Sequence, residues 1–188
     1  MVSGVLKRVA VKLSKTANDL RLLSSGPRAG LGEINLPPRQ AGSSIMPGKV
    51  NPVIPEVVNQ IAFAVIGNDV TVTMAAEAGQ LQLNAFEPIM CRALMMSITQ
   101  LRQGCMTFAD RCVTGITANA DRMRETVEQS IGLVTALSPT IGYEKATYVA
   151  KRALETGQSV RQVVLGENIM SVEDFEAILG DVASLTGS

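Results

Sequence analysis

A dense set of groups that could do chemistry lies at residues 41–52. The stretch Ala-Gly-Ser-Ser-Ile-Met-Pro-Gly-Lys-Val-Asn-Pro places two hydroxyls, one ammonium and one carboxamide among glycines and prolines. Glycine frees the backbone, and proline stops a helix or a strand from running through. The ammonium and the amide can bind carboxylates, and a serine that is desolvated and surrounded by N–H donors can serve as a base. We therefore predict a mobile loop that holds a small dicarboxylate and moves a proton.

Helices are expected on both sides of this loop. Apolar residues between Val2 and Leu20 recur every three or four positions, which is the spacing of one helix face. Glycines and prolines between residues 26 and 51 predict a long, mostly irregular connection after that helix. Asn51 is expected to cap the next helix, with Pro52 in its first turn.

Helices are expected over residues 57–74, with a kink near Gly67, and over residues 86–112. Residues 70–74 alternate like a strand, but no partner strand is evident, so we predict that the helix continues there. The next helix covers 86–112, and its expected buried face is Phe86, Met90, Leu94, Ile98, Leu101, Cys105, Phe108 and Cys112. Further apolar residues lie off this face, so the helix needs neighbours on several sides. This predicts an intersubunit helix bundle.

Shorter helices follow residue 112. Serines, prolines and glycines divide this part into several short helical patterns, and Ser159 and Gln162 have the spacing of a capping box. The predicted fold is all-α. Residues 1–112 form part of a long-helix bundle that carries the loop 41–52, and residues 113–188 form a small C-terminal helical domain.

The composition excludes several classes of function. The chain has 17 basic and 17 acidic residues, and aromatic residues make up only 3%, so a nucleic-acid-binding surface is not expected. The sequence lacks the run of about 18 apolar residues typical of a membrane span. Because the chain has no histidine, it can form neither a Ser-His-Asp triad nor a histidine-based zinc site. We therefore expect no metal site.

Three cysteines occur at spacings of 14 and 7, at Cys91, Cys105 and Cys112. This spacing places them on one helix face, where small buried thiols are the simplest interpretation. An odd number of cysteines without a secretion signal indicates the reducing cytoplasm.

The pattern Gly-Ser-Ser-x-Met-Pro-x-Lys-x-Asn resembles the signature of the aspartase/fumarase superfamily, whose members break a C–N or C–O bond by elimination and release fumarate. The likeness covers essentially the whole chain, and Met74–Asn84 resembles the aspartase branch more than the fumarase branch. The resemblance implies elimination of ammonia from L-aspartate with no organic cofactor. Hydration of fumarate is the alternative activity, and a non-catalytic helical oligomerisation fragment is a third possibility.

By this resemblance, Ser43 is the general base. The residues that bind the substrate lie on the same loop: Ser44, Met46, Lys49 and Asn51. Three further residues support them. Gly42 and Gly48 let the loop close, and Glu56 pairs with a histidine of another subunit. Each residue alone has an ordinary structural explanation, such as a turn serine or a first-turn acid. Their occurrence together at fixed offsets favours the functional interpretation.

The superfamily resemblance also bears on length and assembly. The chain is less than half the usual length of members and resembles their C-terminal portion. Superfamily active sites combine residues from three subunits of a tetramer, and a Thr-His element lies upstream of this portion. We therefore expect a homotetramer for the full-length protein, and a chain that is a fragment and inactive alone.

Overall fold

The computed structural model describes residues 1–26, 28–40 and 50–180. Backbone contacts divide the chain into two compact units, Met1–Asn119 and Ala120–Ser188. The described residues are mainly helical, and their only strands are two pairs of residues in the first unit. The all-α prediction is therefore confirmed.

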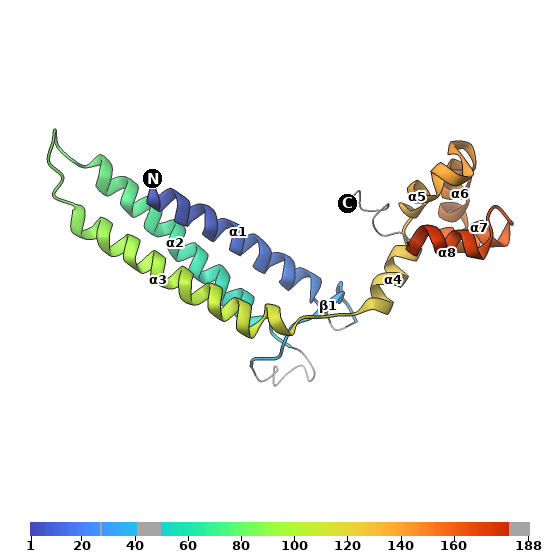
Figure 1. Ribbon diagram of the computed structural model, residues 1–188, viewed down its shortest axis with the longest axis horizontal. Helices are drawn as coiled ribbons and strands as arrows, with labels where there is room; N and C mark the ends of the chain where they lie inside the picture. The colour runs from blue at the N-terminus through green and yellow to red at the C-terminus, as the bar shows by residue number, and fades with distance from the viewer. Residues whose placement is uncertain (27, 41–49, 181–188) are drawn as a thin grey trace. The chain divides into compact units, whose positions relative to one another are not determined.

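Three long helices make up most of the first unit: α1 (Val2–Leu23), α2 (Val53–Glu77) and α3 (Glu87–Arg111). They lie side by side with α2 in the middle, and successive helices run in opposite directions (Figure 1). Residues 70–74 belong to α2, so the helix predicted there is confirmed. Packing against two neighbouring helices outweighs the weak strand preference of the β-branched residues.

Apolar contacts join the three helices at two levels. Near the middle, Ala10 of α1, Ala62 and Val65 of α2 and Leu101 of α3 are buried together. Nearer the loop, a second buried group takes one residue from each helix and two from the connecting segments: Ala17, Val58, Phe108, Leu36 and Cys112. This second group fixes the end of the helices from which the loop 41–52 departs.

The buried face of α3 differs from the predicted one. The residues that it buries are Ala93, Ser97, Leu101, Gly104 and Phe108. Phe86 and Ile98 of the predicted apolar face are exposed in the single chain, so its own helices do not cover them. Cys105 is exposed as well, so its prediction as a buried thiol was wrong. Small residues dominate the true face because α2 approaches closely: a β-carbon on Gly104 would lie only 2.9 Å from Ile61 Cδ1. Cys91 is exposed as well, so only Cys112 fits the prediction of buried thiols.

Polar side chains tie α2 to both neighbours. Asn68 Nδ2 donates to Ser97 Oγ of α3 at 3.1 Å. Asp69 accepts from Ser3 Oγ of α1 at 2.5 Å and pairs with Lys7 Nζ at 3.0 Å. Among the described helices, α2 alone is long and apolar enough by composition to cross a membrane, a property that core helices of globular proteins share. Its residues Asn59, Asn68 and Asp69 are bonded to adjacent helices of this chain.

A two-stranded ladder closes the loop end of the first unit. Strand β1 (Ile34–Asn35) pairs in antiparallel fashion with β2 (Thr117–Ala118). Between α3 and β2 the chain forms a 3₁₀ turn, η1 (Val113–Gly115). Asn119 N also donates to Glu33 O at 2.8 Å. These contacts place residues 113–119 with the first unit, whereas the sequence pattern places the domain boundary after residue 112.

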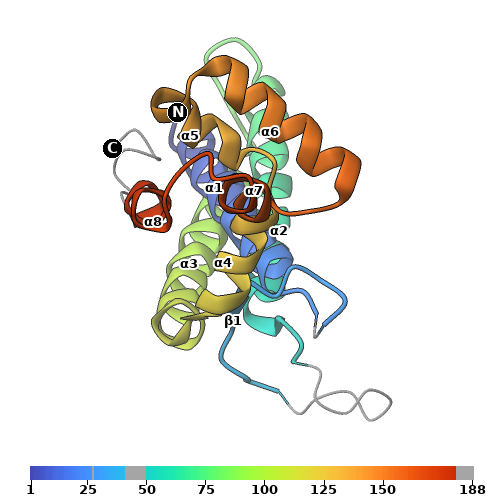
Figure 2. The same cartoon turned by 90° about the vertical axis from the view of Figure 1, so that its right-hand side faces the viewer.

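The described part of the second unit, residues 120–180, contains five short helices: α4 (Ala120–Gln129), α5 (Leu133–Ile141), α6 (Tyr143–Thr156), α7 (Val160–Gly166) and α8 (Val172–Gly180). Helices α5 to α8 gather in one group (Figure 2) around a core that includes Leu137, Val149, Val164 and Phe175. The capping box of α7 is confirmed, because Ser159 and Gln162 bond reciprocally at the start of this helix.

Candidate functional site

The segment that leads into the loop is held by the ladder and by the end of α3. Leu36, directly after β1, is buried in the apolar group at this end of the helices. Arg39 Nε then donates to the backbone O of Arg111 at 2.8 Å. Arg111 is the last residue of α3, where backbone carbonyls lack helical partners and the helix dipole favours a cation. The chain therefore enters the loop from a fixed position.

The segment that leaves the loop runs straight into α2. Val53 N donates to Asn51 O at 2.8 Å, and Glu56 N donates to Pro52 O at 3.1 Å. Pro52, rather than Asn51, is the N-cap residue, and no side chain caps the helix. The prediction that Asn51 caps α2 was therefore wrong. Within the described residues the Asn51 carboxamide makes no hydrogen bond, and the adjoining residues 41–49 lie outside that part of the chain.

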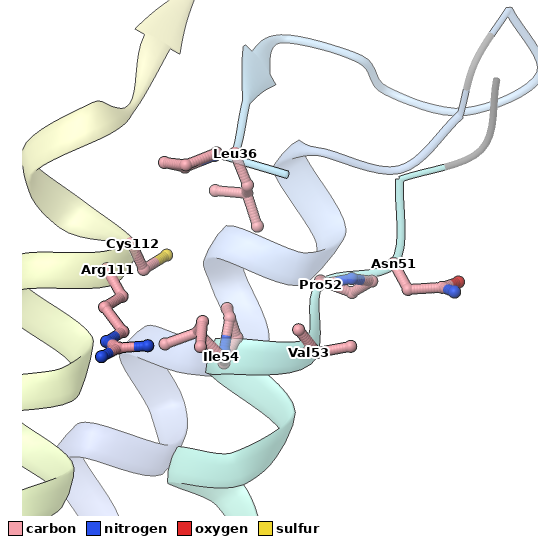
Figure 3. Close-up of a pocket in the computed structure, with 9 residues that line it drawn as sticks. Leu36, Asn51, Pro52, Val53, Ile54, Arg111 and Cys112 are labelled. Carbon is pink, nitrogen blue, oxygen red and sulfur yellow. The ribbon is translucent and has the colours of Figure 1, made fainter. Parts of the chain in front are cut away.

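The two segments meet at one hollow. This shallow hollow is lined by residues before and after the loop, and by the end of α3. Figure 3 shows Leu36, Ile54 and Cys112 grouped along this hollow, whereas the Asn51 carboxamide points away from them. Most of the residues that line the hollow are apolar, and Arg111 and Asn51 are the polar ones.

Cys112 is the only buried thiol of the described cysteines, and it lines this hollow. Burial raises the pKa of the Cys112 thiol, and the nearby Arg39 guanidinium opposes this shift only in part. A raised pKa disfavours the thiolate, which is the reactive form of cysteine. Its burial in the apolar group at this end of the helices makes Cys112 a packing residue.

Glu56 lies in the first turn of α2, where a carboxylate complements the positive end of the helix. Its Oε1 is 3.7 Å from Nη2 of Arg21, in the last turn of α1. The end of α1, the start of α2 and the two ends of the loop thus converge at one end of the first unit (Figure 1).

The structure describes two of the predicted site residues, Asn51 and Glu56. The others lie outside the described residues: Gly42, Ser43, Ser44, Met46, Gly48 and Lys49. Three arginines at this end of the helices were not predicted from the sequence: Arg21, Arg39 and Arg111. Arg21 lies in the last turn of α1, shortly before the Gly- and Pro-rich segment 26–51, and this was the available signal. Arg111 is the last residue of α3, and the segment after it has no such composition. No group of three potential metal-binding side chains occurs among the described residues.

Comparison with known proteins agrees with this architecture. Residues 1–67 match the family described as Lyase, and residues 133–187 match the family described as Fumarase C C-terminus. The chain is 60% identical over 182 residues to an aspartate ammonia-lyase of Pseudomonas aeruginosa, and the matched region covers 97% of this chain and 38% of the relative. It is 58% identical over 185 residues to the Escherichia coli aspartate ammonia-lyase, and the matched region covers 98% of this chain and 38% of that relative.

Two solved structures have the same fold. The fumarate lyase:delta crystallin of Brucella melitensis bound to cobalt matches with a TM-score of 0.89 and 57% identity, over 95% of this chain and 38% of that one. The class II fumarase of Schistosoma mansoni matches with a TM-score of 0.81 and 38% identity, over 94% of this chain and 37% of that one.

The three long antiparallel helices define a portion of a lyase fold. The chain belongs to the aspartase/fumarase superfamily. It spans about 38% of the length of the curated relatives it matches.

Proposed function

We propose that this chain is the portion of an aspartate ammonia-lyase that carries the proton-abstracting loop. The complete enzyme would convert L-aspartate to fumarate and ammonia. The observation that carries the proposal is the identity of 60% and 58% to two relatives named aspartate ammonia-lyase, over almost the whole chain. Hydration of fumarate is less well supported, because identity to the named fumarase is 38%.

The chemistry begins at the carbon next to the β-carboxylate of aspartate. We assign Ser43, acting as an alkoxide, to take a proton from this carbon, which leaves a doubly charged aci-carboxylate. The electron pair then forms the carbon–carbon double bond, and the C–N bond breaks with the amine leaving on the opposite face. Stabilising the aci-carboxylate demands donors aimed at its oxygens, and the anti geometry demands that both carboxylates be held.

The remaining assignments follow from these demands. Lys49 supplies a point charge, and Ser44 and Asn51 supply directional donors to the carboxylates. Met46 forms an apolar wall, and Gly42 and Gly48 allow the loop to close and exclude water. The Asn51 carboxamide makes no hydrogen bond within the described residues, which is consistent with its assignment, and the position of Glu56 next to the loop suits a supporting acid.

The proposal extends to the organisation of the enzyme. The two helical units serve as portions of a central domain and a C-terminal domain, near residues 1–112 and 113–188. The complete protein is a cytoplasmic homotetramer that needs no organic cofactor, and the 188 residues alone do not complete an active site. The exposed apolar side chains on all three long helices support association, and Val5, Phe63 and Met95 are examples.

A chimaeric enzyme tests the proposed function. This segment replaces the matching 182 residues of the Pseudomonas aeruginosa relative, and fumarate is measured with L-aspartate and with L-malate as substrates. Formation of fumarate from aspartate alone supports the proposal. An assembled chimaera that uses malate in preference would identify a fumarase segment, and one that uses neither would contradict a catalytic role. Fumarate formation by the 188-residue chain alone would contradict its assignment as incomplete.

A further inference from the structure

Asn59 is a buried carboxamide on α2, only 4% exposed, three residues after Glu56. Its Nδ2 donates to Ser14 O at 3.1 Å and to Ser14 Oγ at 2.9 Å. A backbone carbonyl can only accept a hydrogen bond, so the group facing it must be the amide nitrogen. The orientation of this carboxamide is therefore fixed, and Oδ1 faces Arg21, whose Nη1 donates to it at 3.3 Å.

The same guanidinium reaches Glu56. Nη1 of Arg21 donates to Asn59 Oδ1 and also, at 3.5 Å, to Asn18 Oδ1 of its own helix, and Nη2 lies 3.7 Å from Glu56 Oε1. A guanidinium is planar and presents its donors in a rigid arrangement, so a contact that fixes one nitrogen also fixes the direction of the other. A buried amide on α2 thus orients a cation of α1, and that cation faces the carboxylate in the first turn of α2.

This arrangement contributes more to orientation than to stability. The side chains of Arg21 and Glu56 are each 41% exposed. Ion pairs with this exposure are screened by water and contribute little to the folded state. Asn59, in contrast, is buried and fully bonded, so it provides a rigid reference point. The carboxylate of Glu56 is consequently held in place at the start of α2, five residues after Asn51.

We infer that Arg21 is a positioning residue for the elimination, acting through Glu56 and held in place by Asn59. This inference rests on the proposed function, in which Glu56 supports the base-bearing loop. Arg21 pairs with Oε1, one of the two carboxylate oxygens of Glu56. A lysine at position 21 would keep the charge but could not bond Asn59 and Glu56 with the same fixed geometry.

The test compares variants of the chimaeric enzyme: Arg21→Met, Arg21→Lys, Glu56→Gln and the double variant with Arg21→Met and Glu56→Gln. We expect Arg21→Met to lower kcat about 30-fold with less than about threefold change in KM, because misplacing a supporting group affects the reaction more than binding. Arg21→Lys should restore part of this loss. The double variant should have a kcat less than about threefold below that of Glu56→Gln alone, because the two residues act as a unit. Lys15→Met is the matched control, since Lys15 pairs with Asp19 on the exposed side of α1 and contacts neither residue.

Stability provides the second readout. Urea unfolding of the 188-residue chain should give nearly the same midpoint for Arg21→Met and for the parent. The inference is overturned if Arg21→Met leaves kcat unchanged, if its effect adds fully to that of Glu56→Gln, or if its kcat loss is matched by unfolding of the chain. If Arg21→Met does not assemble, Arg21→Lys provides the test instead. A kcat of Arg21→Lys equal to that of the parent then overturns the inference. An assembled parent chimaera without aspartate turnover contradicts the proposed function itself, which is a separate result.

Discussion

Lys7 Nζ of α1 lies 3.0 Å from Asp69 Oδ2 of α2, and this ion pair is reinforced by the Ser3 hydroxyl, which donates to Oδ1 at 2.5 Å. The hydrogen bond from Ser3, followed by that from Lys7, lowers the pKa of Asp69 from its ordinary value of 3.8. Because the folded state binds this proton less tightly than the unfolded state, the carboxylate stabilises the fold above the ordinary pKa. That contribution is lost as the pH falls through the lower, folded pKa.

Asp69→Asn should therefore destabilise the chain at neutral pH and should have little effect well below pH 3.8. The measurement is urea unfolding of the parent and the variant across this range. Asp19→Asn is the control, because Asp19 forms an exposed pair within α1. An equal loss of stability at both ends of the pH range would contradict the ionic explanation.

Ser43→Ala in the chimaeric enzyme should lower kcat about 10³-fold, because a general base contributes about 10²–10⁴-fold to the rate. KM for aspartate should change little, since Ser43 is assigned to proton transfer and not to binding. Thr16→Ala, on the exposed side of α1, should behave like the parent. Unchanged turnover of Ser43→Ala would eliminate Ser43 as the base.

Gly104→Val should destabilise the first unit by about 2 kcal/mol, because extra methyl groups would be forced into a tightly packed contact. The contact is that of α3 with Ile61 of α2, where an added β-carbon would lie 2.9 Å from Cδ1. Gly67→Val is the matched control, since a β-carbon there meets nothing within 4 Å. Chemical denaturation measures both variants, and similar results for the two would contradict the close approach of α2 and α3.

Phe175→Ala should destabilise the second unit by about 4 kcal/mol, because it leaves a large cavity. Phe175 is 0% exposed, and its ring also faces the guanidinium of Arg161, whose Cζ lies 5.5 Å from the ring centroid. Val172→Ala changes an exposed position of the same helix and should cost less than about 0.5 kcal/mol. Thermal unfolding followed by circular dichroism compares them, and a small effect of Phe175→Ala would show that α8 is not part of this core.

The sequence predicts the helices better than the faces that they bury. Residues 70–74 could be assigned to a helix because the apolar pattern on either side is long and helical. The buried face of α3 could not be chosen in the same way, since this helix is apolar on more than one side. The choice depends on Gly104 and Ala93, whose small size lets α2 approach, and a periodic pattern of large residues gives no sign of this.

The sequence likewise predicts one part of the candidate site and not the other. The motif in residues 41–52 identifies the chemical groups, because their types and spacing are local properties of the sequence. The role inferred for Arg21 depends on Asn59 and Ser14, which are far apart in the sequence and meet only when α1 and α2 pack. The absence of a side-chain cap at Asn51 likewise follows from the path of the chain around Pro52, which residue preferences alone do not determine.

The ladder of β1 and β2 has a consequence for heat inactivation. Ile34 pairs with Ala118, and the ladder that joins these distant parts of the chain is only two residues long on each strand. So short an element can open by itself, at a lower free energy than the surrounding helices. Its opening would free the segment that leads into the loop while α1, α2 and α3 stay folded. An enzyme built on this unit would lose activity on warming before its helix content falls, and its working temperature would be limited by four residues of strand.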